Sequence, residues 1–194
     1  PNRLGRECTV FDRKDITYKN IVDDIKNKDF PMTIEFFPEE GKYHFDGHRN
    51  CGISMSPEET KKAKKICPSC KKPMTIGVLN RVEELADRPE GFVPKEAKPF
   101  KSFVPLIEAI AFTEGTSSAS KKANEIYSKL INELGTEFNI LLNVSNEDLR
   151  KYVKEKTADF ILRMRTGDIK FVPGFDGVYG KPNNPENSPQ CTKC

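Results

Sequence analysis

The protein has 194 residues, of which 36% are hydrophobic and 31% are charged. Its 13 Phe residues can supply one hydrophobic core or two small ones, which excludes a wholly disordered chain. No segment approaches the ~20 consecutive apolar residues of a membrane helix, so we expect no membrane partner. The net charge is +3, the sequence begins with Pro, and no apolar signal segment follows, which favours a cytoplasmic protein or a fragment of one.

The first half of the chain predicts short elements. Thr17 can cap a helix over residues 17–27, and residues 32–37 are predicted to form a strand between two prolines. Ser56, followed by Pro57 and then Glu59, is typical of a capping box, so a helix is expected from there to residue 65. A strand over 74–79 and an extended linker over 87–101 complete this half.

The second half predicts a helical domain. Helices are expected over residues 104–113 and 117–134, the second capped by Ser117 or Ser118 and ended by Gly135. A third helix is predicted from Ser145 to Gly167. Apolar residues 138–142 and residues 168–172 are interpreted as strands, and the tail from residue 181 as disordered.

These elements, together with the spacing of His48, Cys51, Cys67 and Cys70, predict an α+β chain made of a small zinc ribbon-like module and a mainly helical C-terminal domain. The predicted division is a connector over 1–30, a zinc-binding module over 31–88, a linker over 89–102, a helical domain over 103–180 and a tail over 181–194.

The sharpest motif is His48-x-x-Cys51, followed after fifteen residues by Cys67-x-x-Cys70. Each pair brings two ligands to one ion, and two such pairs complete the tetrahedron of a structural zinc site. Three thiolates and one imidazole leave no position open for catalysis. His44 is the alternative fourth ligand, but the two-residue spacing favours His48. Cys191 and Cys194 form half of a second motif, either a truncated site or an incidental tail.

Positive charge concentrates around this motif, because residues 49–101 hold 12 Lys or Arg against 7 Asp or Glu. Lysines beside a zinc site are typical of proteins that follow a phosphate backbone, so we predict a nucleic acid as the partner. A merely solvated lysine-rich surface is the alternative. The predicted nucleic-acid-binding residues are Arg49, Lys61, Lys62, Lys64, Lys65, Lys71, Lys72 and Arg81.

Other chemistries have little support. The segment from Gly115 to Lys122 has the outline of a phosphate-binding loop, but it lacks the second Gly and the Ser or Thr that would hold magnesium. No nucleophilic triad is possible, because both His residues lie in the zinc turn. The acidic residues Glu35, Glu39, Glu40 and Asp46 could bind a metal, although such residues are more often surface turn charges. We predict no catalytic residue in this chain.

Four long motifs are specific enough for comparison with known families. They are Thr33 to Lys42 (TIEFFPEEGK), Tyr43 to Cys51 (YHFDGHRNC), Thr75 to Arg88 (TIGVLNRVEELADR) and Pro173 to Gly180 (PGFDGVYG). Together they resemble the endonuclease Q family. The likeness extends from Asn2 to about Lys181.

The resemblance implies a parent enzyme that nicks DNA 5′ to deaminated bases, such as uracil or hypoxanthine, or to abasic sites. In that family a polymerase-and-histidinol-phosphatase (PHP) domain carries the catalytic divalent metals and ends just before a Leu-Gly-Arg-Glu stretch, which Leu4 to Glu7 match. The chain is therefore expected to follow the catalytic ligands, to be inactive alone and to engage damaged duplex DNA. A zinc-stabilised protein-interaction module and a helicase-associated accessory domain without NTPase activity are the alternatives, and a replication or repair protein partner stays unknown.

Overall fold

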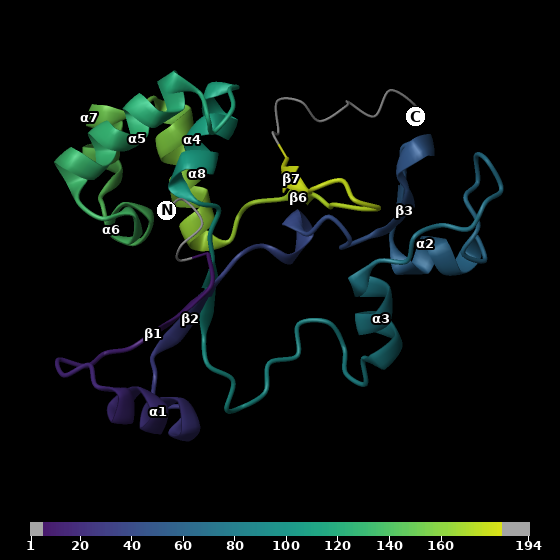
Figure 1. Cartoon of the computed structure of the whole chain (residues 1–194), viewed down its shortest axis with the longest axis horizontal. Helices are drawn as coiled ribbons and strands as arrows, with labels where there is room; N and C mark the ends of the chain where they lie inside the picture. The colour runs from purple at the N-terminus through teal and green to yellow at the C-terminus, as the bar shows by residue number, and fades with distance from the viewer. Residues whose placement is uncertain (1–5, 184–194) are drawn as a thin grey trace. The chain divides into compact units, whose positions relative to one another are not determined.

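The computed structural model describes residues 6–183 and has the α+β fold that the sequence predicted. Two compact units divide the chain, and each is built from two segments (Figure 1). The helical unit contains residues 6–36 and Lys95–Ile169. The second unit contains Phe37–Pro94 and residues 170–183, and we call it the metal-binding unit after the four predicted ligands that it contains. No described helix is both long and apolar enough to cross a membrane.

The helical unit contains a three-stranded sheet of order β1-β2-β5. Strand β2 (Met32–Glu35) pairs antiparallel with β1 (Cys8–Val10) and parallel with β5 (Phe100–Ser102), which lies within the predicted linker. Helix α1 (Tyr18–Asn27) connects β1 to β2, and the Thr17 hydroxyl caps it as predicted by accepting from the Asn20 N–H at 3.2 Å.

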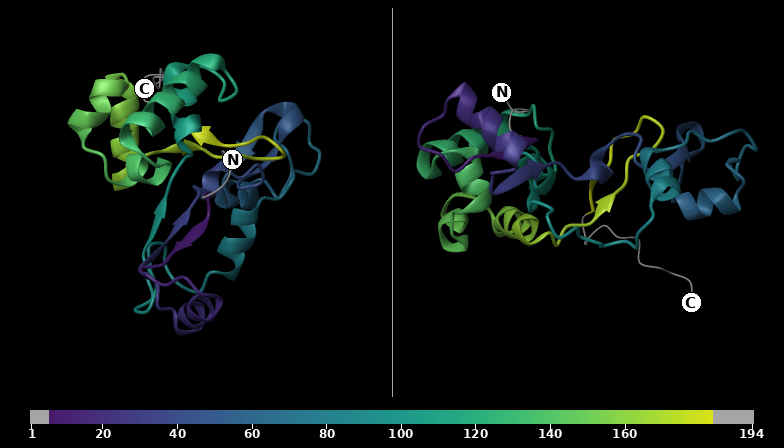
Figure 2. Two further views of the ribbon diagram at one scale, coloured as in Figure 1. Left: turned by 60° about the vertical axis from the view of Figure 1, so that its left-hand side comes forward. Right: turned by 90° about the horizontal axis from the view of Figure 1, so that it is seen from below.

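The helices of this unit pack around a buried apolar core. Helix α4 (Leu106–Glu114) packs against α5 (Lys121–Leu134) and α8 (Glu155–Thr166), while α6 (Glu137–Leu142) and α7 (Asn146–Tyr152) complete the bundle, as Figure 2 shows from two further sides. Its fully buried large side chains are Leu106, Ile110, Leu130, Ile140, Leu141, Leu149 and Ile161.

Three predictions for this unit were wrong in detail. Residues 138–142 belong to helix α6 rather than to a strand, because the Thr136 hydroxyl caps that segment by accepting from the Asn139 N–H at 3.3 Å. Ser120, not Ser117 or Ser118, caps α5. The helix predicted from Ser145 to Gly167 is divided into α7 and α8 at Val153, whose backbone is extended with φ −130° and ψ 163°.

The metal-binding unit is built around a β-hairpin. Strand β3 (Asp46–His48) pairs antiparallel with β4 (Ile53–Met55), and the short helix η2 (Arg49–Cys51) connects them. Helices α2 (Pro57–Lys62) and α3 (Val78–Leu85) follow, and the unit also contains η1 (Pro38–Glu40), β6 (Phe171–Val172) and β7 (Lys181–Pro182).

Sequence prediction was partly right here too. The capping box is confirmed, since the Ser56 N–H donates to Glu59 Oε2 at 2.8 Å while Ser56 Oγ accepts from the Glu59 N–H at 3.4 Å. The helix ends before Lys64 and Lys65, which adopt left-handed φ of 53° and 62°. Residues 74–79 form no strand, because α3 begins among them. The strand expected over 168–172 contains only Phe171–Val172, and most of the predicted disordered tail lies outside the described residues.

Residues 173–180 return to the start of the metal-binding unit. The Gly174 N–H donates to Glu39 O at 2.8 Å, and the Gly180 N–H donates to Glu40 O at 3.1 Å. A Cβ on Gly180 would lie 1.9 Å from Glu39 O, so this close approach requires glycine. The Phe37 and Phe171 rings of the same unit pack against each other, with centroids 4.6 Å apart.

Candidate metal centre

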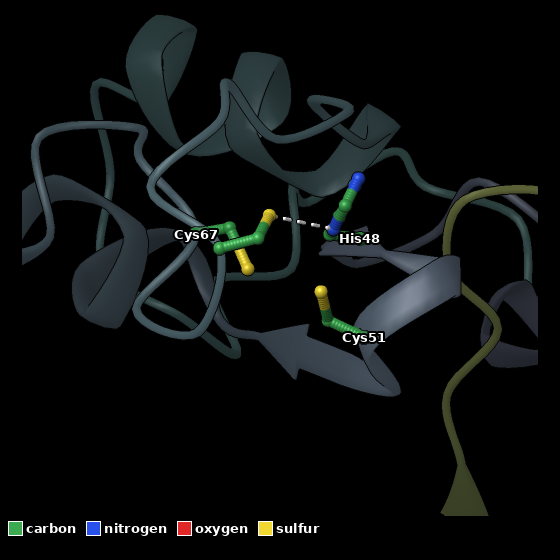
Figure 3. Close-up of side chains that lie close together, drawn as sticks. His48, Cys51 and Cys67 are labelled. Atoms are coloured by element: carbon green, nitrogen blue, oxygen red, sulfur yellow. Dashed lines mark hydrogen bonds between the residues drawn. The ribbon is translucent and has the colours of Figure 1, made fainter.

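The four predicted ligands converge on one point. The ligand atoms of His48, Cys51, Cys67 and Cys70 all lie within 4.8 Å of one another, and His48 Nδ1 is 3.4 Å from Cys70 Sγ. Figure 3 shows the side chains of His48, Cys51 and Cys67 pointing toward one another. Zn–S bonds of about 2.3 Å would place tetrahedral ligands about 3.8 Å apart. The cluster could therefore hold one metal ion after small side-chain adjustments, and three thiols with one imidazole suit zinc.

Two tight turns bring the ligands together. His48 ends β3 and Cys51 ends η2, after which Gly52 takes a left-handed φ of 64° and its N–H donates to Arg49 O at 3.0 Å. The second turn is closed by hydrogen bonds between its ends, from the Lys71 N–H to Cys67 O at 2.9 Å and from the Cys67 N–H to Lys72 O at 2.8 Å. Backbone hydrogen bonds therefore define both turns and bring the four side chains toward one point.

The turn also favours ionisation of one thiol. The backbone N–H of Cys70, with further donors from Ser69 and nearby thiols, lowers the pKa of Cys67 from 9.0 to about 7 despite burial. The pKa of Cys51 is raised instead, first by its hydrogen bond with Cys70 and then by burial. A thiolate at Cys67 is the form that a metal requires.

Asp46 connects the first metal-binding turn to α3 from a fully buried position. Its Oδ1 accepts from the Gly77 N–H at 2.6 Å, and its Oδ2 accepts from Asn80 Nδ2 at 2.7 Å. Gly77 is the N-terminal cap residue of α3, so this carboxylate satisfies a donor that the helix leaves unpaired. Sequence analysis placed Asp46 among surface turn charges, which was wrong.

Asp176 supports the same turn from the far end of the sequence. Its Oδ2 accepts from the Arg49 N–H at 2.6 Å, between the ligands His48 and Cys51, and its Oδ1 accepts from Thr75 Oγ1 at 2.6 Å. The Thr75 hydroxyl, followed by the Arg49 N–H, lowers the pKa of the Asp176 carboxyl. Sequence analysis missed this role, and only the unusual Phe-Asp-Gly turn could have indicated it.

The alternative ligand His44 does not join the cluster. Its ring stacks on Phe45 with centroids 5.5 Å apart, and burial lowers its pKa, against a smaller opposing effect of Glu39. Among the described residues, Glu35, Glu39 and Glu40 form no group that could hold a metal ion. Cys191 and Cys194 lie outside the described residues.

The comparisons with known proteins cover nearly the whole chain. In the crystal structure of the lesion-specific endonuclease Q of Pyrococcus furiosus, the match has a TM-score of 0.83 at 30% identity and spans 95% of this chain and 46% of that one. A second matching structure is endonuclease Q in complex with a 27-mer duplex substrate that has an abasic lesion at the active site. The match has a TM-score of 0.80 at 30% identity and spans 96% of this chain and 47% of that one. Over nearly its whole length, this chain is similar to part of endonuclease Q.

Two sequence relatives also match nearly the whole chain, whereas a family model matches only part of the helical unit. The family model described as the MJ0043 C-terminal domain matches residues 105–168. The uncharacterized protein MJ0043 of Methanocaldococcus jannaschii is 32% identical over 93% of this chain and 23% of its own length. The uncharacterized protein YqxK of Bacillus subtilis is 28% identical over 92% of this chain and 43% of its own length. This chain thus spans less than half the length of each of these relatives.

The motifs that resemble endonuclease Q have structural roles in the metal-binding unit. Residues 43–51 supply the first turn and Asp46, residues 75–88 contain α3, and residues 173–180 supply Asp176. Three stretches that are distant in sequence are therefore joined by the hydrogen bonds of two aspartates.

The eight basic residues predicted to bind DNA all belong to this unit, but they differ in their surroundings. Lys62 pairs with Glu58 at 2.7 Å, and Arg81 pairs with Glu84 at 2.6 Å. Lys61 and Lys65 line a hollow between α2 and α3 that also contains Glu58, Glu83 and Glu84. Lys71 Nζ donates to Pro68 O at 2.9 Å.

Lys64 and Lys72 are exposed and make no ion pair with any residue the structure describes, and Arg49 is exposed too. Their role in DNA binding stays a prediction.

Proposed function

We propose that this chain is the substrate-engaging part of a DNA endonuclease that nicks 5′ to deaminated bases or abasic sites, and that it follows a catalytic PHP domain in the whole protein. The observation that supports this proposal is the match over 95% of the chain to an enzyme described as a lesion-specific endonuclease. A related structure contains duplex DNA with an abasic lesion, which supports DNA as the partner.

The proposed cofactor is one structural zinc ion held by His48, Cys51, Cys67 and Cys70. The donor set is full, so the ion would stabilise the fold rather than activate water. The chain's own residues would position the turn, since Asp176 accepts from the N–H of Arg49 between two ligands.

We propose that lysines near the zinc turns contact the phosphate backbone. Backbone contacts fix position without reading sequence, which suits an enzyme that must search any DNA for damage. Because Glu58 and Glu84 already pair with Lys62 and Arg81, the unpaired Lys64 and Lys72 should contribute most per residue. Exposed ion pairs are worth only about 0–1 kcal/mol, so a phosphate could still displace the acidic partners.

The test replaces Lys61, Lys62, Lys64 and Lys65 together by Gln. Binding to damaged and undamaged duplexes should weaken about equally, and the slope of log K against log salt should fall by about one for each phosphate that the variant no longer neutralises. Lys14, Lys19, Lys26 and Lys28 of the helical unit, replaced by Gln together, give a control with the same change in charge.

Unchanged affinity and salt slope in the first variant would refute this role. A protein-interaction module would then be favoured, and one feature of α3 supports that second candidate. Val78, Val82 and Leu85 recur at helical spacing and are 54–64% exposed, which is unusual for a row of apolar residues.

A further inference from the structure

Two exposed tyrosines of the metal-binding unit share one lysine. Tyr179 is 72% exposed and Tyr43 is 44% exposed. Lys42 Nζ lies 5.5 Å from the centre of the Tyr43 ring and 5.9 Å from the centre of the Tyr179 ring. Residues that are more than a hundred positions apart in the sequence thus form one surface. We call it the tyrosine surface and define it as Lys42, Tyr43, Arg49 and Tyr179.

The backbone under this surface is fixed. The Gly177 N–H donates to Lys42 O at 2.8 Å, and Phe175 and Val178 exchange two backbone hydrogen bonds of 3.0 and 2.8 Å. Gly177 has a left-handed φ of 86°, and a Cβ there would lie 3.3 Å from Arg49 Nη1 and 3.8 Å from Tyr43 Oη. Arg49 and Tyr43 therefore both lie beside Gly177, and the loop presents its cations and rings in a defined arrangement.

This combination suits one kind of ligand. Proteins that bind unpaired nucleic-acid strands combine cations for the phosphates with exposed aromatic rings on which bases stack. In a duplex the faces of the bases are covered by their neighbours and only the edges are accessible in the grooves. The largely exposed ring of Tyr179 therefore matches an unstacked base, which is the form that base-processing enzymes extrude.

We propose that the tyrosine surface binds an unstacked nucleotide of DNA, with the base stacked on Tyr179 and the neighbouring phosphates contacted by Lys42 and Arg49. The proposal rests on the proposed function and extends it, because it assigns base contact to residues other than the lysines near the zinc turns. Tyr43 would hold Lys42 between the two rings, as a positioning residue.

The experiment compares two probes of equal length and charge, an oligothymidylate and an oligomer of abasic deoxyribose phosphates. Stacking contributes about 1–3 kcal/mol per base, so the full chain should bind the thymidylate about tenfold more tightly. Tyr179→Ala should remove most of this preference, whereas Tyr179→Phe should keep it because the ring remains. Tyr18→Ala, at a position that is 86% exposed in the helical unit, is the matched control and should bind both probes as the unchanged protein does.

Equal affinity of the unchanged protein for the two probes would overturn the proposal, and so would a Tyr179→Ala variant that keeps the preference. Duplex binding measured in parallel separates this failure from that of the proposed function. If duplex binds with the expected salt slope while the thymidylate has no advantage, only the tyrosine surface is refuted, and a protein ligand becomes its alternative. If neither probe nor duplex binds, both proposals fail.

Discussion

Asp46→Ala should destabilise the metal-binding unit by about 3–4 kcal/mol. The carboxylate is fully buried and accepts two hydrogen bonds, of 2.6 Å from the Gly77 N–H and 2.7 Å from Asn80 Nδ2. Hydrogen bonds to a charged group contribute about 1.5–3 kcal/mol each, and the change leaves two donors without their acceptor. Partial relaxation of Asn80, which is not fully buried, places the expected loss toward the lower end of the sum.

Urea unfolding followed by circular dichroism measures this loss, at a fixed free zinc concentration because bound metal adds its own stability. Asp46→Asn is the matched control. It keeps an acceptor for the Gly77 N–H and lets the Asn80 amide turn its oxygen toward the new donor, so it should cost about half as much. An Asp46→Ala variant within about 1 kcal/mol of the unchanged protein would refute the reasoning, since the two donors would then have found other partners.

The remaining predictions concern the metal and one buried carboxylate. Elemental analysis should find one zinc per chain, and zinc-free protein purified without chelators would contradict this. Asp176→Ala should weaken zinc binding about 10–100-fold in a chelator competition, because residues that orient metal ligands typically contribute that much to affinity. Lys122 and Lys154 hold the pKa of Glu114 at about 2 instead of 4.5, and its carboxylate is almost fully buried. The stability that the charged carboxylate contributes is thus complete above pH 4.5 and is lost as pH falls toward 2. Glu114→Gln should therefore lower the free energy of unfolding by about 2 kcal/mol at pH 7 and by little at pH 2, measured by thermal or urea unfolding. An equal cost at both pH values would show that charge is not involved.

Local signals in the sequence predicted much of the fold. Thr17 and Ser56 cap their helices through donors three residues away, so the sequence contains both partners of each contact. The two metal-binding turns are also local, because each pair of ligands is separated by only two residues. Spacing alone therefore predicted which four residues converge.

Long-range contacts explain what sequence analysis missed. Residues 74–79 are rich in β-branched side chains and predicted a strand, yet α3 starts at Val78 because Asp46, distant in sequence, accepts the Gly77 N–H. The apolar run 138–142 is too short to distinguish a strand from a buried helix, and Thr136 decides in favour of the helix. Asp176 contacts Arg49 across 127 positions, a separation that no local pattern records.

That separation has a consequence for the order of events on the ribosome. All four metal ligands have been synthesised by residue 70, but Asp176 follows more than a hundred residues later, which at 5–20 residues per second is a delay of about 5–20 s. During this interval the hairpin lacks its hydrogen bonds to Asp176 and the cover of residues 173–180. A zinc ion that binds early would keep the two turns together until those residues emerge, so zinc supply during translation should affect the yield of folded protein more than zinc added afterwards.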